Sequence, residues 1–178
     1  MNKNFEKKID HLVDHLVDKH SKKRDVKWNG SKYYEWKIMP ATQKGDCGEE
    51  VICCCINNYI DIENAEIINR GKGDFDILTE SGVKIECKTA TEDVNGGFQF
   101  NGIKKNIGYD YVIGLGVSPN DLWFNIWSKK EMKKLTVPMT KNGSDTFKLS
   151  ANKSPNAKYK VLSVTEENFL REWKSKIG

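Results

Sequence analysis

The sequence predicts an α/β fold in one domain, because helical and strand patterns alternate along a chain of 178 residues. Helical spacing of apolar residues marks residues 5–20, 46–59 and the region after Thr165. Short apolar runs bounded by turn residues predict strands over 65–68, 74–79, 83–88, 109–117 and 122–127. The 38% of hydrophobic residues suits one domain with a modest core.

The two ends of the chain are expected to carry helices that pack on the body. In the N-terminal helix, residues 5–20, the apolar stripe includes Leu12 and Val13. The segment that follows, residues 28–36, is polar and aromatic, which predicts an irregular path or a short strand. The C-terminal helix is expected to start near Thr165 and to pack through Phe169, Leu170 and Trp173.

The central helix is expected to begin at Asp46, because Asp46 and Glu49 have the spacing of a capping box. It should turn part of its sequence inward, namely Cys47, Val51, Cys54 and Cys55.

Three further segments complete the second half of the chain. Residues 99–106 follow a glycine-containing loop and are predicted to be helical, as are residues 128–135. Residues 139–160 are rich in Asn, Ser and Lys, so we expect a long surface excursion there.

Composition excludes some locations and leaves the partner open. The longest apolar run, residues 51–56, is far shorter than the roughly 20 residues of a membrane span. The N-terminus lacks the pattern of a secretory signal, and the five cysteines suit reduced thiols, so we expect a cytoplasmic protein with no membrane contact. A net charge of +4 suits a polyanionic partner without requiring one.

The candidate functional residues lie in the predicted hairpin of residues 74–88. Side chains alternate along a strand, so Glu86 and Lys88 share one face. A three-residue loop closed by Gly82 would place Asp76 directly opposite Glu86, with the two backbones roughly 5 Å apart. Two such carboxylates suit a divalent cation such as Mg²⁺. Asp74 has the same parity as Asp76 and remains the alternative.

Phe75-Asp76 followed by Glu86-Cys87-Lys88 resembles the PD-(D/E)xK motif of restriction-endonuclease-like nucleases, with Phe75 in place of the usual proline. The resemblance covers about residues 45–127 and implies a mixed central β-sheet flanked by helices. It also implies Mg²⁺-dependent hydrolysis, with the metal held by Asp76, Glu86 and the Cys87 carbonyl, and with Lys88 activating water.

An upstream helix that bears a glutamate is common in this superfamily. Glu49 or Glu50 would occupy that position here, and the sequence does not choose between them. The run from Phe98 to Lys104 is similar to the segment after the active-site strand in several type II restriction endonucleases, which implies that Gln99 lies near the catalytic face.

Double-stranded DNA is the expected partner. The residues expected to contact it are Gln99, Asn101, Lys104, Lys105, Lys141 and Lys153. The polar stretch 139–160 offers further base contacts through Asn142, Ser144, Asn152 and Asn156, and a further phosphate contact through Lys148.

The predicted protein is therefore a type II restriction endonuclease in one nuclease domain. An N-terminal helix and arm over 1–44 would precede a catalytic core over 45–135 and a polar loop with a C-terminal helix over 136–178. A chain of this size has room for one active site, so cutting both strands implies a homodimer or a partner subunit. Two alternatives stay open: a junction-resolvase-like nuclease of the same fold, and a non-catalytic DNA-binding module.

Overall fold

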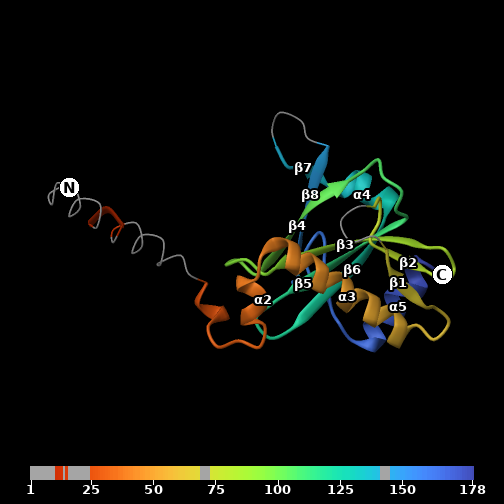
Figure 1. The fold of residues 1–178 in the computed structure, drawn as a ribbon, viewed down its shortest axis with the longest axis horizontal. Helices are drawn as coiled ribbons and strands as arrows, with labels where there is room; N and C mark the ends of the chain where they lie inside the picture. The colour runs from red at the N-terminus through yellow and green to blue at the C-terminus, as the bar shows by residue number, and fades with distance from the viewer. Residues whose placement is uncertain (1–10, 14, 16–24, 69–72, 141–144) are drawn as a thin grey trace.

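The protein is described by a computed structural model that covers residues 1–178, of which 1–10, 14, 16–24, 69–72 and 141–144 are not described (Figure 1). The helices are η1 (Val26–Trp28), α2 (Tyr34–Ile38), α3 (Ala41–Tyr59), α4 (Lys129–Leu135) and α5 (Glu166–Lys176). The strands are β1 (Ala65–Ile67), β2 (Ile77–Thr79), β3 (Lys84–Thr91), β4 (Gly97–Lys104), β5 (Tyr111–Val117), β6 (Leu122–Ser128), β7 (Val137–Pro138), β8 (Thr146–Asn152) and β9 (Leu162–Ser163).

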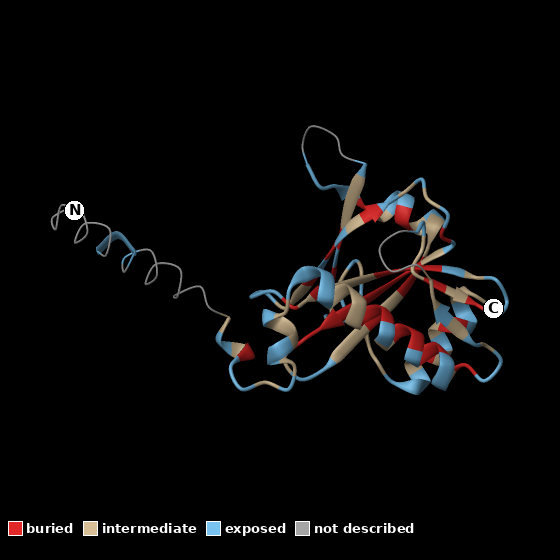
Figure 2. Ribbon diagram, in the orientation of Figure 1, coloured by how far each residue is buried: buried red, intermediate tan, exposed pale blue. Residues whose placement is uncertain are grey.

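A mixed sheet of six strands forms the centre, in the order β1-β2-β3-β5-β6-β9. Only β3 and β5 run parallel, and the other neighbours in this sheet are antiparallel. Figure 2 shows buried residues concentrated in these middle strands. The predicted α/β fold with a mixed central sheet and flanking helices is therefore confirmed.

Helices α3 and α5 cover one face of this sheet (Figure 1). Phe169 and Trp173 of α5 are buried there, as predicted. The predicted start of α3 is wrong, because the helix begins at Ala41 after Pro40, and Asp46 lies inside it rather than capping it. Pro40 can precede a first turn without losing a hydrogen bond, since the first N–H groups of a helix have no partner within it.

The inward face of α3 also differs from the prediction. Cys55 is buried as expected, but Cys54 is exposed, and Cys47 and Val51 are only half-buried. The longer helix turns a different stripe toward the sheet, which is made of Gly48, Glu49, Ile52, Cys53, Cys55 and Ile56.

A small sheet, in the order β4-β8-β7, packs on the other face of the central sheet. Close packing is possible because two glycines of β5 leave room for aromatic rings. A Cβ added at Gly114 would lie 2.9 Å from the Phe100 ring, and one added at Gly116 would lie 2.8 Å from the Phe98 ring. Phe98 and Phe100 are fully buried as a result.

This small sheet overturns two predictions. Residues 99–106 are not helical: β4 runs from Gly97 to Lys104, with Phe98 and Phe100 inward and a register shift between Phe100 and Ile103. The expected surface excursion over 139–160 instead contains β8, whose Leu149 and Ala151 are buried against β4. The segment is polar overall, and its few apolar residues are buried because β8 pairs with β4.

The structure describes only part of the N-terminal segment for which a helix and a short strand were predicted. Most of the helix predicted over 5–20 lies outside the described residues, and Leu12 and Val13 are exposed rather than packed. The short strand or irregular path predicted for residues 28–36 is wrong at both ends of the segment. The helix η1 ends at Trp28, and the helix α2 begins at Tyr34. In the described part of the chain, no helix is long and apolar enough to cross a bilayer.

Candidate functional site

The hairpin of β2 and β3 has the predicted register. Leu78 pairs with Lys84 and Ile77 with Ile85, and Asp76 lies one residue beyond the last of these pairs. Gly82 adopts a φ of 89° and its N–H donates to the Thr79 carbonyl at 2.9 Å, which closes the predicted three-residue loop. Asp76 and Glu86 lie close enough for the charge of Asp76 to raise the pKa of Glu86.

Asp76 lies where the pairing of β2 with β3 ends. Its backbone N–H donates to the Ile85 carbonyl at 2.9 Å, and its Oδ2 accepts the Cys87 N–H at 2.7 Å. Backbone groups alternate in direction along a strand, so the Cys87 carbonyl points to the same side as the Cys87 N–H. This carbonyl oxygen thus faces the edge of β3 that Asp76 occupies.

Glu86 and Lys88 form an ion pair inside the protein. Glu86 is only 6% exposed, and its Oε1 contacts the Lys88 Nζ. Burial raises the pKa of Glu86, and the charge of Asp76 raises it further against the opposing effect of Lys88. Burial acts to lower the pKa of Lys88, but the charge and hydrogen bond of Glu86 outweigh it and the pKa lies above its usual value. The ammonium therefore compensates two close carboxylates.

The structure separates the two upstream glutamates. Glu49 is buried on the face of α3 that meets β3, and its charge is among those that raise the pKa of the Cys87 thiol, after burial and Asp76. Glu50 is exposed and lines a different cavity, beside Tyr33 and Cys54. Glu49, and not Glu50, lies beside the hairpin.

Asp74 is exposed and lies beside Gly108, where an added Cβ would meet its side chain at 3.3 Å. Asp76, by contrast, acts electrostatically on Glu86, Cys87 and Lys88. Asp76 is thus the carboxylate that contacts β3, through the Cys87 N–H.

The residues predicted to bind DNA are divided among several places. Lys104 is exposed at the end of β4, and its charge lowers the pKa of Glu86, so it borders the site. Lys105 donates to the Lys133 carbonyl at 3.2 Å and lies 3.9 Å from the Phe147 ring centre. Lys153 is held by Glu92 at 2.8 Å, away from the hairpin. Lys141, Asn142 and Ser144 are outside the described residues.

Gln99 and Asn101, predicted to contact DNA, lie on β4 of the small sheet. Both are exposed on β4, on the side opposite to the buried Phe98 and Phe100. The Gln99 Nε2 donates to the Asn101 Oδ1 at 3.0 Å. They belong to the outer face of the small sheet.

Tyr109 is a neighbour of the site that sequence reasoning missed. It is 1% exposed, and burial, followed by the charge of Glu86, raises its pKa to about 12. The only sequence signal is its place two residues before β5, at the start of an apolar run, which gives no indication of a carboxylate nearby. It packs beside Glu86 on the face toward the small sheet.

A second charged cluster was also missed. Glu92, 4% exposed at the end of β3, accepts Lys27 Nζ at 2.9 Å and Lys153 Nζ at 2.8 Å, and its carbonyl accepts Lys37 Nζ at 3.2 Å. The three lysines are far from Glu92 in sequence, so no local pattern could reveal the cluster. It ties the segment before α3 and the loop after β8 to the end of β3.

The candidate metal donors at the hairpin are all oxygen atoms. Across the described ranges, no three His, Cys, Asp or Glu side chains gather as possible ligands of one metal. Mg²⁺ usually takes one or two carboxylates, with waters and substrate oxygens completing its octahedron. Asp76, Glu86 and the Cys87 carbonyl are oxygen donors of this kind.

The chain was also compared with known proteins. No protein-family model matches the sequence, and no curated protein sequence is significantly similar to it. The functional inference accordingly rests on the geometry around Asp76, Glu86 and Lys88.

Proposed function

We propose that the protein is a Mg²⁺-dependent endonuclease that hydrolyses DNA phosphodiester bonds, with a restriction-endonuclease-like core and the activity of a type II restriction enzyme. The observation that carries the proposal is the end of one hairpin: the Asp76 Oδ2 accepts the N–H of Cys87, between Glu86 and Lys88, and the Lys88 ammonium pairs with Glu86. This is the residue arrangement of the PD-(D/E)xK motif.

Asp76, Glu86 and the Cys87 carbonyl would hold the Mg²⁺. Burial and the nearby Asp76 charge already disfavour an unpaired Glu86 carboxylate, so a cation between the two carboxylates would relieve the repulsion. When bound, the ion supplies charge for the phosphate oxygens and the departing oxygen.

Lysine side chains of the site have distinct roles in this proposal. Lys88 is largely enclosed, and its ammonium is fixed by Glu86, so it holds and orients the attacking water in line with the phosphorus atom. Lys104, exposed at the border of the site, binds a phosphate of the same strand. Glu49, buried on α3 near Cys87, would position β3 rather than the substrate.

Double-strand cleavage requires a second active site. One chain carries a single Asp76–Glu86–Lys88 face, so the proposal includes a homodimer with one site for each strand. A single chain without a partner would cut only one of the two strands.

The experiment is incubation of supercoiled plasmid with the purified full-length protein and Mg²⁺, followed by sequencing of the DNA ends. Discrete fragments with one common end sequence are expected, and none with EDTA. Lys88→Ala is expected to lower the cleavage rate by about 10²- to 10⁴-fold. Lys174→Ala is the matched control, because Lys174 is an exposed lysine on α5, across the central sheet from the site.

Circular dichroism of each variant separates loss of fold from loss of chemistry. Cleavage confined to branched DNA would indicate a junction-resolvase-like enzyme. Salt-sensitive binding with no cleavage under Mg²⁺ or Mn²⁺ would refute the enzymatic proposal and favour a DNA-binding module.

A further inference from the structure

The outer face of β4 and β8 presents a row of polar side chains. Inward residues alternate with outward ones along both strands, and the pairing sets Gln99 directly opposite Ser150. Asn101 follows on β4, and Lys148 follows on β8. The inner side of the same strands is fully apolar at Phe98, Phe100, Leu149 and Ala151. The strand pattern therefore builds the centre of this face.

Gln99 and Asn101 are held as a pair. The Gln99 Nε2 donates to the Asn101 Oδ1 at 3.0 Å, which restrains both amides while each keeps further donor and acceptor atoms. Directly after Asn101 the strand bulges, with Gly102 at a φ of 74° and a register shift before Ile103. The bulge turns Lys104 outward, so this face continues to the border of the hairpin site.

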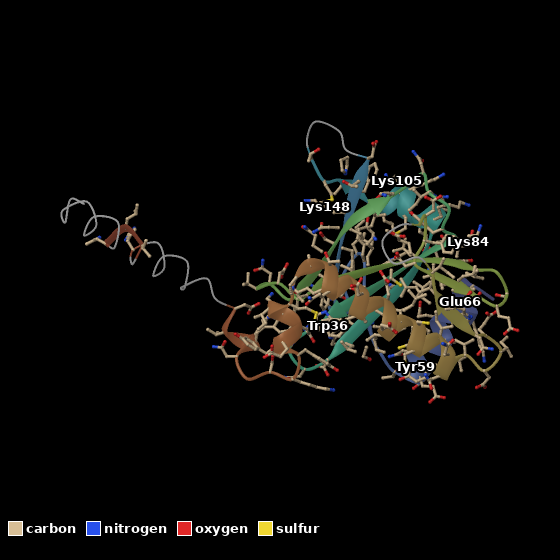
Figure 3. All side chains as sticks on the ribbon, viewed as in Figure 1. Trp36, Tyr59, Glu66, Lys84, Lys105 and Lys148 are labelled. Atoms are coloured by element: carbon tan, nitrogen blue, oxygen red, sulfur yellow. The ribbon has the colours of Figure 1, made fainter. Side chains whose placement is uncertain are left out.

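The charges of the face favour a polyanion. Its lysines outnumber its acids: Lys104, Lys148 and Lys158 are accompanied by Asp93 and Asp145 at the two ends. Figure 3 shows Lys105 and Lys148 on the small sheet, away from Tyr59 on the helical side. A cavity of about 450 Å³ continues the face beyond Ser150, and its polar lining includes Gln99, Asn152, Ser154, Asn156 and Lys158.

We infer that the outer face of the β4–β8 ribbon lies in the major groove of duplex DNA and reads its bases, with Gln99 and Asn101 as the reading residues. Two paired strands are about 5 Å apart, and with their side chains they fit a major groove about 12 Å wide. Gln and Asn side chains can make two hydrogen bonds to adenine through its N6 and N7 atoms. The expected recognition sequence therefore contains adenine.

This inference rests on the proposed function for its choice of DNA as the ligand. Lys104 connects the outer face of β4 and β8 with the hairpin site, because it is the last residue of β4 and its charge lowers the pKa of Glu86. Reading and hydrolysis would then use adjacent parts of one duplex.

The test is selection of binding sites from a random duplex library by the full-length Lys88→Ala protein with Mg²⁺, which leaves bound DNA uncut. A consensus containing adenine is expected. Gln99→Ala and Asn101→Ala, each made in the Lys88→Ala protein, should each lower the preference at one or two positions by about 5- to 150-fold, with binding to unrelated duplex unchanged. Asn58→Ala is the matched amide control, since Asn58 is exposed on α3, across the central sheet.

Lys148→Ala tests the phosphate contacts separately. It should weaken binding to all duplexes alike and lower the salt slope by about one, whereas Lys174→Ala should not. The inference is overturned if no consensus emerges, if single strands or RNA bind as well as duplex, or if Gln99→Ala and Asn101→Ala keep the full preference.

The two proposals fail in different ways. Sequence-independent cleavage would keep the nuclease and refute the reading face. A consensus that depends on Gln99 and Asn101, without cleavage by the wild-type protein, would keep the reading face and refute the nuclease.

Discussion

At Gly48, α3 closely approaches Thr89 of β3, the strand that carries Glu86 and Lys88. A Cβ built on Gly48 would lie 1.8 Å from the Thr89 Oγ1 and 3.0 Å from the Thr89 Cβ. Rotation of Thr89 could move the hydroxyl away, but the short approach to its Cβ would remain. Gly48→Ala is therefore expected to push α3 away from β3.

Gly45 provides the matched control in the same helix. An added Cβ at Gly45 meets no atom within 4 Å, so Gly45→Ala should stabilise the protein by about 1 kcal/mol through helix propensity alone. Gly48→Ala receives the same gain but adds overpacking of about 1 to 3 kcal/mol. The two variants should thus differ by about 2 kcal/mol, or about 6 °C in Tm.

Thermal and urea unfolding followed by far-UV circular dichroism measure this difference. Thr89→Ala removes the clashing hydroxyl, so Gly48→Ala should cost less in that background, with a coupling of about 1 kcal/mol. If Gly48→Ala stabilises the protein as much as Gly45→Ala does, or costs the same in both backgrounds, the close packing of α3 on β3 is refuted.

Two further predictions concern buried charge and thiol reactivity. Burial acts to raise the pKa of Glu92, but hydrogen bonds from Lys153 and Lys27 outweigh it, and the pKa lies below its ordinary 4.5. The free energy of unfolding of the wild type should therefore be about 2 kcal/mol higher than that of Glu92→Gln near neutral pH, and this difference should disappear as the pH falls below 4.5. Urea unfolding at several pH values measures it, and a difference that persists in acid would contradict the prediction. Cys54 is exposed whereas burial raises the pKa of Cys55 to about 12, so a thiol reagent should modify the native protein fastest at Cys54 and Cys54→Ser should abolish that phase; an unchanged fast phase would disprove this assignment.

The hairpin could be predicted because its information is local. A three-residue loop with Gly82 fixes the register of Ile77 and Leu78 on β3, and this brings the neighbouring Asp76 close to Glu86 and Cys87. The C-terminal helix was equally accessible, since Phe169 and Trp173 recur at helical spacing and are buried.

Strands β4 and β8 could not be found in this way. The bulge at Gly102 shifts the alternation after Phe100, so the pattern from Phe98 to Lys104 fits neither period well. In β8 a polar sequence surrounds Leu149 and Ala151, and burial comes from pairing with β4. The start of α3 was obscured by the polar residues and glycine between Ala41 and Asp46, which resemble a loop.

Within the candidate site, the sequence located the hairpin residues but not their surroundings. Nothing local distinguishes Glu49 from Glu50, because their difference depends on how α3 rotates against β3. Tyr109 and the Glu92 cluster depend on contacts between distant segments for the same reason.

Gly114 and Gly116 give the two sheets a fixed separation, because any side chain there would enter the rings of Phe100 and Phe98. In the proposed nuclease, which would contact bases with one sheet and cleave with the other, this separation would set the distance between the recognised bases and the cleaved bond. Larger residues at the two glycines would increase that distance. The cleavage offset would then be encoded in the thickness of the core, by residues that touch no DNA.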